Sequence, residues 1–448
     1  MLVKQLFRRT VTPFQLLLLY YFCAILFSVC LLRLPWVHKE GVDVSLLDSL
    51  FTAVSAVSVT GLTTINVAES YTSFGYAMVL IILQIGAIGI MSIGTFIWLL
   101  VGKKIGMRER QMIMIDHNQY NLSGVVQLIR EITLLLFAIE LVGAFVLTVH
   151  FKRYFDWQEA FFNGLFTAVS ATTNGGFDIT GMSLQPFHAD YFVQFVTMVL
   201  IMLGAIGFPV LIEVKTFLLR KNPSFRFSLF TKITTTTYGL LFIFGAVVIF
   251  LIEIFQSFRG MKWHEAVMSA LYHSSSTRSA GLTTVDVQEF SEATDLFMSA
   301  LMFIGASPSS VGGGIRTTTF AIVILFLITY ARGRSDIHVF KREIHIIDVF
   351  RSFVVIILAA FLVLASAMIL HITEPGATTT QILFEVTSAF GTCGMSLGLT
   401  DHLSTPGKFV VMLLMFIGRV GLISFLYSIG GRAKKFPYHY PKERVIIG

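Results

Sequence analysis

Eight apolar segments, each long enough to cross a lipid bilayer as a helix, dominate the sequence. A helix needs about 20 apolar residues to span the hydrocarbon core of a membrane. The segments are residues 14–34, 74–101, 124–150, 191–218, 233–256, 295–330, 346–371 and 407–430. Of the 448 residues, 55% are hydrophobic and only 13% are charged, and that charged share is about half of what soluble domains carry. The sequence therefore predicts an all-α, polytopic membrane protein embedded in a lipid bilayer.

The basic residues indicate how these segments are oriented. Lys and Arg gather at the N-terminus and in the segments 101–112, 215–232, 331–352 and 431–448, which hold 3, 4, 5, 5 and 5 of the 33 such residues. Cytoplasmic loops of membrane proteins carry such an excess. We therefore expect both termini in the cytoplasm. The formal net charge of +7 follows from this topology, and nucleic-acid binding is not needed to explain it.

Four short stretches in the other connections resemble one another. They cover residues 48–61, 163–176, 268–281 and 381–394, and each is too short to span a bilayer. Aligned without gaps, they share a serine column and, six residues later, a glycine column. The columns are Ser55, Ser170, Ser275 and Ser388, and Gly61, Gly176, Gly281 and Gly394. A second glycine column follows in the next apolar segments, at Gly86, Gly204, Gly305 and Gly418.

These columns divide the chain into four tandem repeats, each a helix, a P-loop (pore loop) and a second helix. The repeats cover residues 14–101, 124–218, 232–330 and 345–430, between a cytoplasmic N-terminus (1–13) and a cytoplasmic tail (431–448). Repeats that share one orientation are related by an axis along the membrane normal. We therefore predict a pseudo-fourfold arrangement around a central pore. For Gly86, Gly89, Gly204 and Gly207 we favour a simpler interpretation, close packing of helices at small residues.

Each short stretch is predicted to form a half-helix that ends in a glycine loop at membrane depth. Backbone at that depth is tolerated only inside the protein or beside a watery cavity. Its carbonyl oxygens can replace the hydration shell of a monovalent cation, and the negative C-terminal end of each half-helix favours a cation. The predicted filter residues are Val59, Thr60, Gly61, Asn174, Gly175, Gly176, Ser279, Ala280, Gly281, Thr392, Cys393 and Gly394. Because the loops differ outside the glycine column, we expect backbone carbonyls, not side chains, to coordinate the ion.

A single chain of four helix–P-loop–helix units, each with one filter glycine, resembles the Trk/Ktr/HKT superfamily of potassium transporters over essentially its whole length. Because the chain starts almost at its first repeat helix, it looks like the Ktr-type membrane subunit. The resemblance implies K⁺ uptake across the bacterial plasma membrane, commonly stimulated by Na⁺. It also implies a homodimer that works on a cytosolic ring of nucleotide-binding regulatory subunits. In plant relatives a serine in the first filter position goes with Na⁺ transport, so Gly61 implies a preference for K⁺.

The sixth apolar segment cannot be one straight helix. It contains Pro308, which removes a helical hydrogen bond, and three consecutive glycines. One interpretation is a kink in an ordinary span. The other is a loop at membrane depth that lines the cavity below the filter, and the family resemblance favours it, because the corresponding segment there is the intramembrane gating loop. The predicted gate residues are Ser307, Pro308, Ser309, Ser310, Val311, Gly312, Gly313, Gly314 and Arg419.

Arg419 lies inside the last apolar segment. An arginine at membrane depth costs several kcal/mol or more unless it is paired or hydrated. It is either a structural residue held by backbone carbonyls or, as the resemblance implies, a pore-lining charge that helps the loop form a barrier to cations.

Enzymatic functions find little support in the sequence. It contains no Walker A motif, no dinucleotide fingerprint in a strand–turn–helix setting and no HExxH motif, so we expect neither an enzyme nor a nucleotide site in this chain. Regulation would then come from outside. The segments 103–121, 215–231, 332–345 and 432–448 are the candidate docking surfaces, although they also fit simple positive-inside anchors. The alternative function is a sodium-coupled secondary transporter with alternating access.

Overall fold

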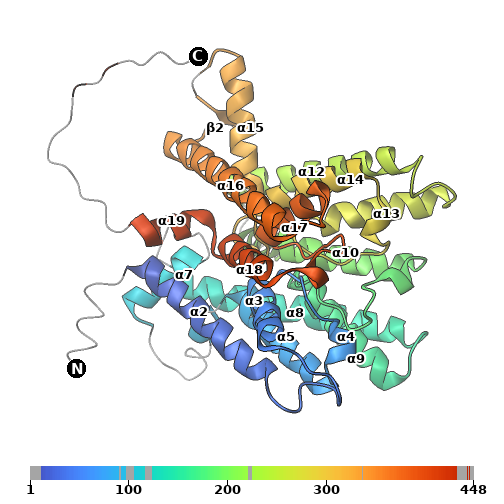
Figure 1. Cartoon of the computed structure of the whole chain (residues 1–448). Coiled ribbons are helices and arrows are strands. Elements are labelled where there is room, and N and C mark those ends of the chain that lie inside the picture. Colours follow the sequence, from blue (N-terminus) through green and yellow to red (C-terminus); the bar gives the residue numbers. More distant parts are fainter. Residues whose placement is uncertain are drawn as a thin grey trace, which may run out of the picture.

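The computed structural model describes residues 12–89, 92–96, 105–116, 124–219, 225–334 and 336–430, together with residues 441 and 443. These residues are mostly helical, and the one sheet among them is a hairpin of β1 (His338–Val339) and β2 (Arg342–Glu343). Figure 1 shows the helices and the hairpin, which lies beside α15 (Thr317–Ala331) at one end of the molecule. The predicted all-α, polytopic membrane fold is confirmed. Three predicted segments lie mainly or partly outside the described residues. These are most of the N-terminus 1–13, most of the tail 431–448 with its docking segment 432–448, and part of the docking segment 103–121.

Four helices in the described part are long and apolar enough to cross a membrane. They are α2 (Pro13–Leu32), α8 (Val125–Phe151), α12 (Leu229–Glu253) and α16 (Ile346–Thr373). In each, 28% to 44% of the most apolar window is buried inside the protein, so most of its surface is left for contact with lipid. They coincide with the first, third, fifth and seventh predicted segments. The helix α2 begins with a capping box, in which Thr12 and Gln15 bond to each other's backbone amides.

A short helix follows each long one. These are α3 (Leu46–Ser58), α9 (Trp157–Thr172), α13 (Trp263–Ser276) and α17 (Thr379–Gly391), with 13 to 16 residues each. At about 1.5 Å per residue they rise about 20–24 Å, less than the roughly 30 Å of a hydrocarbon core. Their last turns are wholly buried. The short helices pack on neighbouring helices. The helix α9 packs on α8, and α13 packs on α12, whereas α17 packs on α14 (Glu292–Ile304) and on α18 (Thr405–Val420).

The second helix of each predicted repeat is interrupted, which the sequence indicated only for residues 295–330. The helix α10 (Tyr191–Ala205) meets α11 (Phe208–Leu218) at an angle of 105°. A single residue separates the end of α18 from the start of α19 (Leu422–Gly430). In the first repeat α5 (Ser73–Ile88) ends, and residues 92–96 are helical again. A glycine with a left-handed backbone lies at each interruption, and these are Gly89, Gly207, Gly305 and Gly421, with φ between 67° and 101°. Hydropathy does not register such a bend, because the flanking residues remain apolar.

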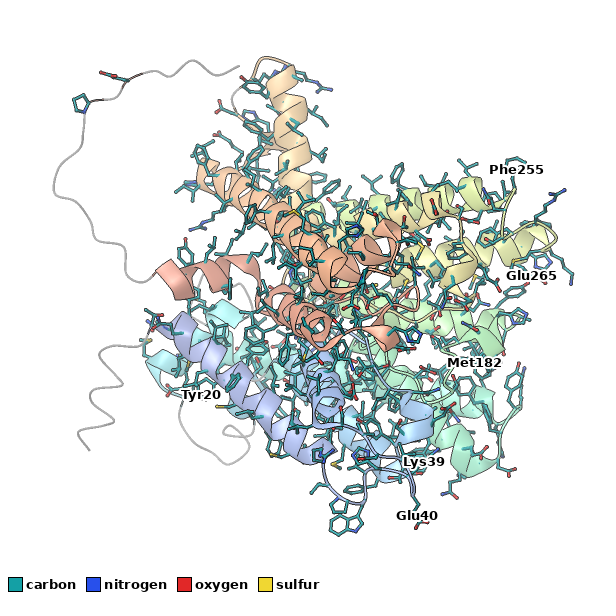
Figure 2. All side chains as sticks on the ribbon, in the orientation of Figure 1. Tyr20, Lys39, Glu40, Met182, Phe255 and Glu265 are labelled. Carbon is teal, nitrogen blue, oxygen red and sulfur yellow. The ribbon has the colours of Figure 1, made fainter. Side chains whose placement is uncertain are left out.

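Polar contacts join the repeats on the side where the short helices begin. Lys408 on α18 forms an ion pair with Asp48 on α3 at 2.7 Å, and the Leu184 amide donates to the Thr283 carbonyl at 2.9 Å. The remaining elements there are α4 (Val67–Ser70), η1 (Gln185–Phe187), η2 (Val287–Glu289) and η3 (Thr400–His402), whereas α7 (Met107–Asp116) packs on α2. Figure 2 places the labelled Lys39, Glu40, Met182, Phe255 and Glu265 along one side of the molecule. The connections that hold the short helices thus open to a common side.

Candidate ion pathway

The four predicted filter loops have the same backbone shape. Each begins at the end of a short helix, and the residue two positions before the column glycine has a positive φ. These residues are Val59, Asn174, Ser279 and Thr392, with φ of 57°, 52°, 86° and 48°. The column glycines Gly61, Gly176, Gly281 and Gly394 have φ of 96°, 68°, 70° and 99°. A left-handed backbone is uncommon at residues other than glycine, and rarer still at β-branched valine and threonine.

The four loops also meet in a closed ring. A Cβ atom added to Gly61 would lie 2.7 Å from the Gly175 carbonyl oxygen, and one on Gly176 would lie 3.1 Å from that of Ala280. Added to Gly281 or Gly394, it would collide with the carbonyl oxygen of Cys393 or of Thr60, respectively. Each loop therefore touches the next, from the first repeat round to the fourth and back to the first. Only glycine fits at these positions.

The carbonyl groups at this ring are free to face an ion. Within the described residues, the carbonyls of Thr60, Gly175, Ala280 and Cys393 accept no hydrogen bond. The side chains of these loops are buried, whereas the four column glycines are partly accessible. Buried backbone carbonyls are nearly always paired, so four unpaired ones at one ring indicate a site for a ligand that offers positive charge.

Three members of the serine column tie their predicted filter loops to the helix before them, a role that sequence reasoning did not assign. In the first and fourth repeats the amides of Gly61 and Gly394 donate to Ser55 Oγ and Ser388 Oγ at 3.0 and 3.1 Å. In the second, Ser170 Oγ donates to the Phe177 carbonyl at 2.6 Å. The third repeat differs, since Ser276 rather than Ser275 makes the corresponding bond. The recurrence of serine six residues before each column glycine was the sequence signal that could have predicted these hydrogen bonds.

We expect the change Ser388→Ala to lower the free energy of unfolding by about 0.5–1.5 kcal/mol, because it removes the acceptor of the partly buried Gly394 amide. Thermal unfolding in detergent measures this loss. The matched control is Ser275→Ala in the same column, because Ser275 Oγ is buried and has no partner among the described residues. An equal loss in both variants would show that the tie to Gly394 is not what stabilises the loop.

The predicted gate residues 307–314 form a loop between α14 and α15, directly against the filter ring. The Gly313 amide donates to Ser279 Oγ at 3.3 Å, and Ser279 Oγ donates to the Thr392 carbonyl at 2.6 Å. On its other side the loop follows the bend between α10 and α11, where the amides of Ser307 and Val311 donate to the Ala205 and Gly204 carbonyls. The loop is almost wholly buried, so the structure places it within the protein, next to the third and fourth filter loops.

Two arginines hold this loop. Arg419 on α18 donates to the carbonyls of Val311 in the loop and of Gly86 and Ala87 in the first repeat. Arg316 donates to the carbonyls of Gly312 and Ser307. The sequence left two roles open for Arg419. The structure shows it held by backbone carbonyls, as expected for a structural residue. One of these carbonyls belongs to the loop, as expected if Arg419 helps the loop to form a barrier. The loop and Arg419 together connect all four repeats.

A cavity of about 180 Å³ opens over the filter ring on the side of the short-helix connections. Its lining includes two of the column glycines, Gly61 and Gly176, and two carboxylates, Asp178 and Asp401. The Asp178 carboxylate accepts hydrogen bonds from the amides of Thr180, Gly181 and Ser183 at 2.7–3.1 Å, which fixes its position. Sequence reasoning missed these two aspartates. Asp178 follows its filter glycine by only two residues, but Asp401 becomes a neighbour through folding alone.

Comparisons with known proteins identify the family of the chain. The family model TrkH, a cation transport protein, matches residues 7–435. The chain is 53% identical over 441 residues to the Ktr system potassium uptake protein D of Bacillus subtilis, with 98% of each chain covered. It is 32% identical over 454 residues to the potassium/sodium uptake protein NtpJ of Enterococcus hirae, with 100% of each covered.

A solved structure has the same fold. The crystal structure of the potassium transporter TrkH from Vibrio parahaemolyticus matches with a TM-score of 0.68 at 18% identity, over 91% of this chain and 83% of that one. The family match confirms the predicted resemblance and the prediction that the chain is a transporter rather than an enzyme. The chain belongs to the TrkH family of cation transport proteins.

Proposed function

We propose that this chain is the K⁺-translocating membrane subunit of a bacterial Ktr-type uptake system, with one pore through the ring of filter loops. The observation that carries the proposal is that ring, in which four carbonyls without hydrogen-bond partners in the described residues surround four partly accessible glycines. Rings of backbone carbonyls replace the hydration shell of K⁺. Potassium is named for both relatives, the potassium uptake protein D of Bacillus subtilis and the potassium/sodium uptake protein NtpJ of Enterococcus hirae, and this supports K⁺ as the transported ion.

The surroundings of the ring fit a pathway for cations. The cavity with Asp178 and Asp401 would collect cations above the filter, because a recess lined by one sign of charge concentrates the opposite ion. Residues 307–314 with Arg419 would form the gate below it. Backbone coordination requires no side-chain metal site, and no cluster of three or more His, Cys, Asp or Glu residues that could hold a metal occurs in the part of the chain that the structure describes.

Uptake through such a pore needs no chemical energy from this chain. The membrane potential contributes about 2.3 kcal/mol per charge per 100 mV. At roughly −150 mV that is about 3.5 kcal/mol, or on the order of 300-fold accumulation of a monovalent cation. We further propose Na⁺ as an activator, a homodimer, cytoplasmic termini, and a cytosolic nucleotide-binding ring as the regulatory partner. The alternative, a sodium-coupled carrier with alternating access, is less favoured, because such carriers usually consist of inverted or two-fold repeats, whereas this chain has four similar loops in one orientation.

K⁺ uptake in a bacterial strain without its own uptake systems tests the proposal. We expect growth and ⁸⁶Rb⁺ uptake at limiting K⁺ when the chain is produced, a further rise when a cytosolic nucleotide-binding partner is produced with it, and stimulation by added Na⁺. Absence of K⁺-dependent uptake in cells that contain the inserted protein would contradict the proposed function. Uptake that requires one Na⁺ for each K⁺ would favour the carrier.

A further inference from the structure

A third arginine at membrane depth differs from Arg316 and Arg419. Arg278 lies three residues before the filter glycine Gly281, and its side chain is completely buried. Its Nε, Nη1 and Nη2 atoms have no hydrogen-bond partner among the described residues. Arg316 and Arg419 each donate to backbone carbonyls. Arginine remains charged even when it is buried, so Arg278 is an uncompensated positive charge inside the protein.

The position of Arg278 is defined by its neighbours. It follows Thr277, which caps the C-terminal end of α13, and α13 is held on α12 by a 2.7 Å bond from Ser274 Oγ to the Phe242 carbonyl. Tyr238 on α12 and the predicted filter residue Cys393 lie near the guanidinium group, and the Cys393 thiol donates to the Ser276 carbonyl at the end of α13 at 3.4 Å. Tyr238 in turn packs against Ala205 and Ala306, where the gate loop begins. The charge therefore lies behind the third filter loop, beside the fourth and near the gate.

Arg278 changes the field that the short helices create. The C-terminal end of a helix carries a partial negative charge, which attracts a cation. At the end of α13 the positive charge of Arg278 opposes this attraction. The corresponding residues in the other three repeats, Ser58, Thr173 and Gly391, are uncharged. The ring thus has three short helices that attract a cation and a fourth side that carries a fixed positive charge, weakly screened because it is buried.

We propose that Arg278 is a fixed positive charge that weakens the binding of K⁺ in the filter and so sets the affinity of transport. The inference rests on the proposed filter. Conduction requires that an ion bind firmly enough to enter and weakly enough to leave. Carbonyls and helix ends on three sides favour entry, and the charge of Arg278 on the fourth side favours release. Arg278 acts through space rather than by touching the ion.

Two substitutions separate the charge of Arg278 from its shape. Arg278→Met keeps a long side chain and removes the charge, and Arg278→Lys keeps the charge. We expect Arg278→Met to lower the half-saturating K⁺ concentration for ⁸⁶Rb⁺ uptake about tenfold and to lower the maximal rate, because the ion leaves more slowly. A tenfold change corresponds to about 1.4 kcal/mol, which two unit charges about 12 Å apart supply at an effective permittivity of about 20. Arg278→Lys should have a half-saturating K⁺ concentration and a maximal rate close to those of the unchanged protein.

The control is Arg130→Gln, which removes an equal charge from an exposed position on α8 and should leave the half-saturating concentration unaltered. Calorimetric titration of the purified membrane protein with K⁺ measures the affinity without transport. An unchanged or weaker affinity in Arg278→Met, or an equal shift in Arg278→Lys, would overturn the inference. Failure of Arg278→Met and Arg278→Gln to assemble, while Arg278→Lys assembles, would identify a structural role and overturn it as well. The two proposals can fail separately. If Gly61→Ser alters the competition between Na⁺ and ⁸⁶Rb⁺ but Arg278→Met leaves the K⁺ affinity unchanged, the proposed filter is supported and only the inference about Arg278 is wrong.

Discussion

Gly61→Ser is expected to reduce the preference of transport for K⁺ over Na⁺ by about tenfold or more, a difference of about 1.4 kcal/mol in relative stabilisation of the two ions. Gly61 has a φ of 96°, and a Cβ atom there would lie 2.7 Å from the Gly175 carbonyl oxygen and 2.8 Å from the Gly176 Cα atom. The side chain has no room, so the first and second loops must separate. That separation changes the spacing of the carbonyls around the ion.

The direction of the effect does not depend on how the filter selects K⁺. Selectivity has been attributed to the size of the carbonyl ring and to the number and field strength of its carbonyls, and a displaced loop changes both. The measurement is competition by Na⁺ against ⁸⁶Rb⁺ uptake over a range of Na⁺ concentrations.

A suitable control is Gly41→Ser. Gly41 also has a positive φ, 84°, but a Cβ atom on it would meet nothing within 4 Å. The control therefore carries a comparable backbone strain without touching the ring, and its ion competition should equal that of the unchanged protein. Identical competition curves for Gly61→Ser and Gly41→Ser would show that the first loop is not part of the filter.

The sequence was sufficient for the features that a membrane imposes through length and spacing. The long helices α2, α8, α12 and α16 were predictable because about 20 apolar residues are needed to cross a bilayer. The filter loops were predictable because four glycines recur in equivalent places after segments too short to cross. The assignment of these loops as a filter remains a proposal, although the structure brings all twelve predicted residues into four adjoining loops.

Other features were not predictable, because they depend on contacts between distant residues. The interruptions at Gly207 and Gly421 lie within long, mostly apolar segments that hydropathy reads as continuous. The left-handed backbone at Val59 goes against the preference of a β-branched residue, so only the surrounding loops can impose it. The same holds for the hydrogen bonds of the arginines, since the sequence does not show that Arg419 finds carbonyl acceptors whereas Arg278 finds none in the described residues.

Deletion of residues 309–314 is expected to raise K⁺ flux by about tenfold or more, which corresponds to a barrier lower by about 1.4 kcal/mol. The deleted segment includes Val311, which accepts from Arg419, and Gly313, which donates to Ser279 beside the filter. The deletion can close without moving α14 and α15, because the ends of the loop already meet. The Thr317 amide donates to the Ala306 carbonyl at 3.1 Å, and the Arg316 amide donates to the Ile304 carbonyl at 3.0 Å.

Arg419→Gln tests the same barrier without shortening the chain, and we expect a smaller rise in flux than the deletion gives. The substitution removes a positive charge below the filter and leaves the carbonyls of Val311 and Gly86 without their donor, so the loop loses its attachment to the first and fourth repeats. Arg351→Gln on α16, where the arginine is largely exposed, controls for the loss of one positive charge. Flux is measured as ⁸⁶Rb⁺ entry into liposomes that contain the purified protein without a cytosolic partner. Unchanged or lower flux in both gate variants, with elution as correctly assembled protein, would exclude residues 309–314 and Arg419 as the barrier, because removing a barrier cannot slow the ion.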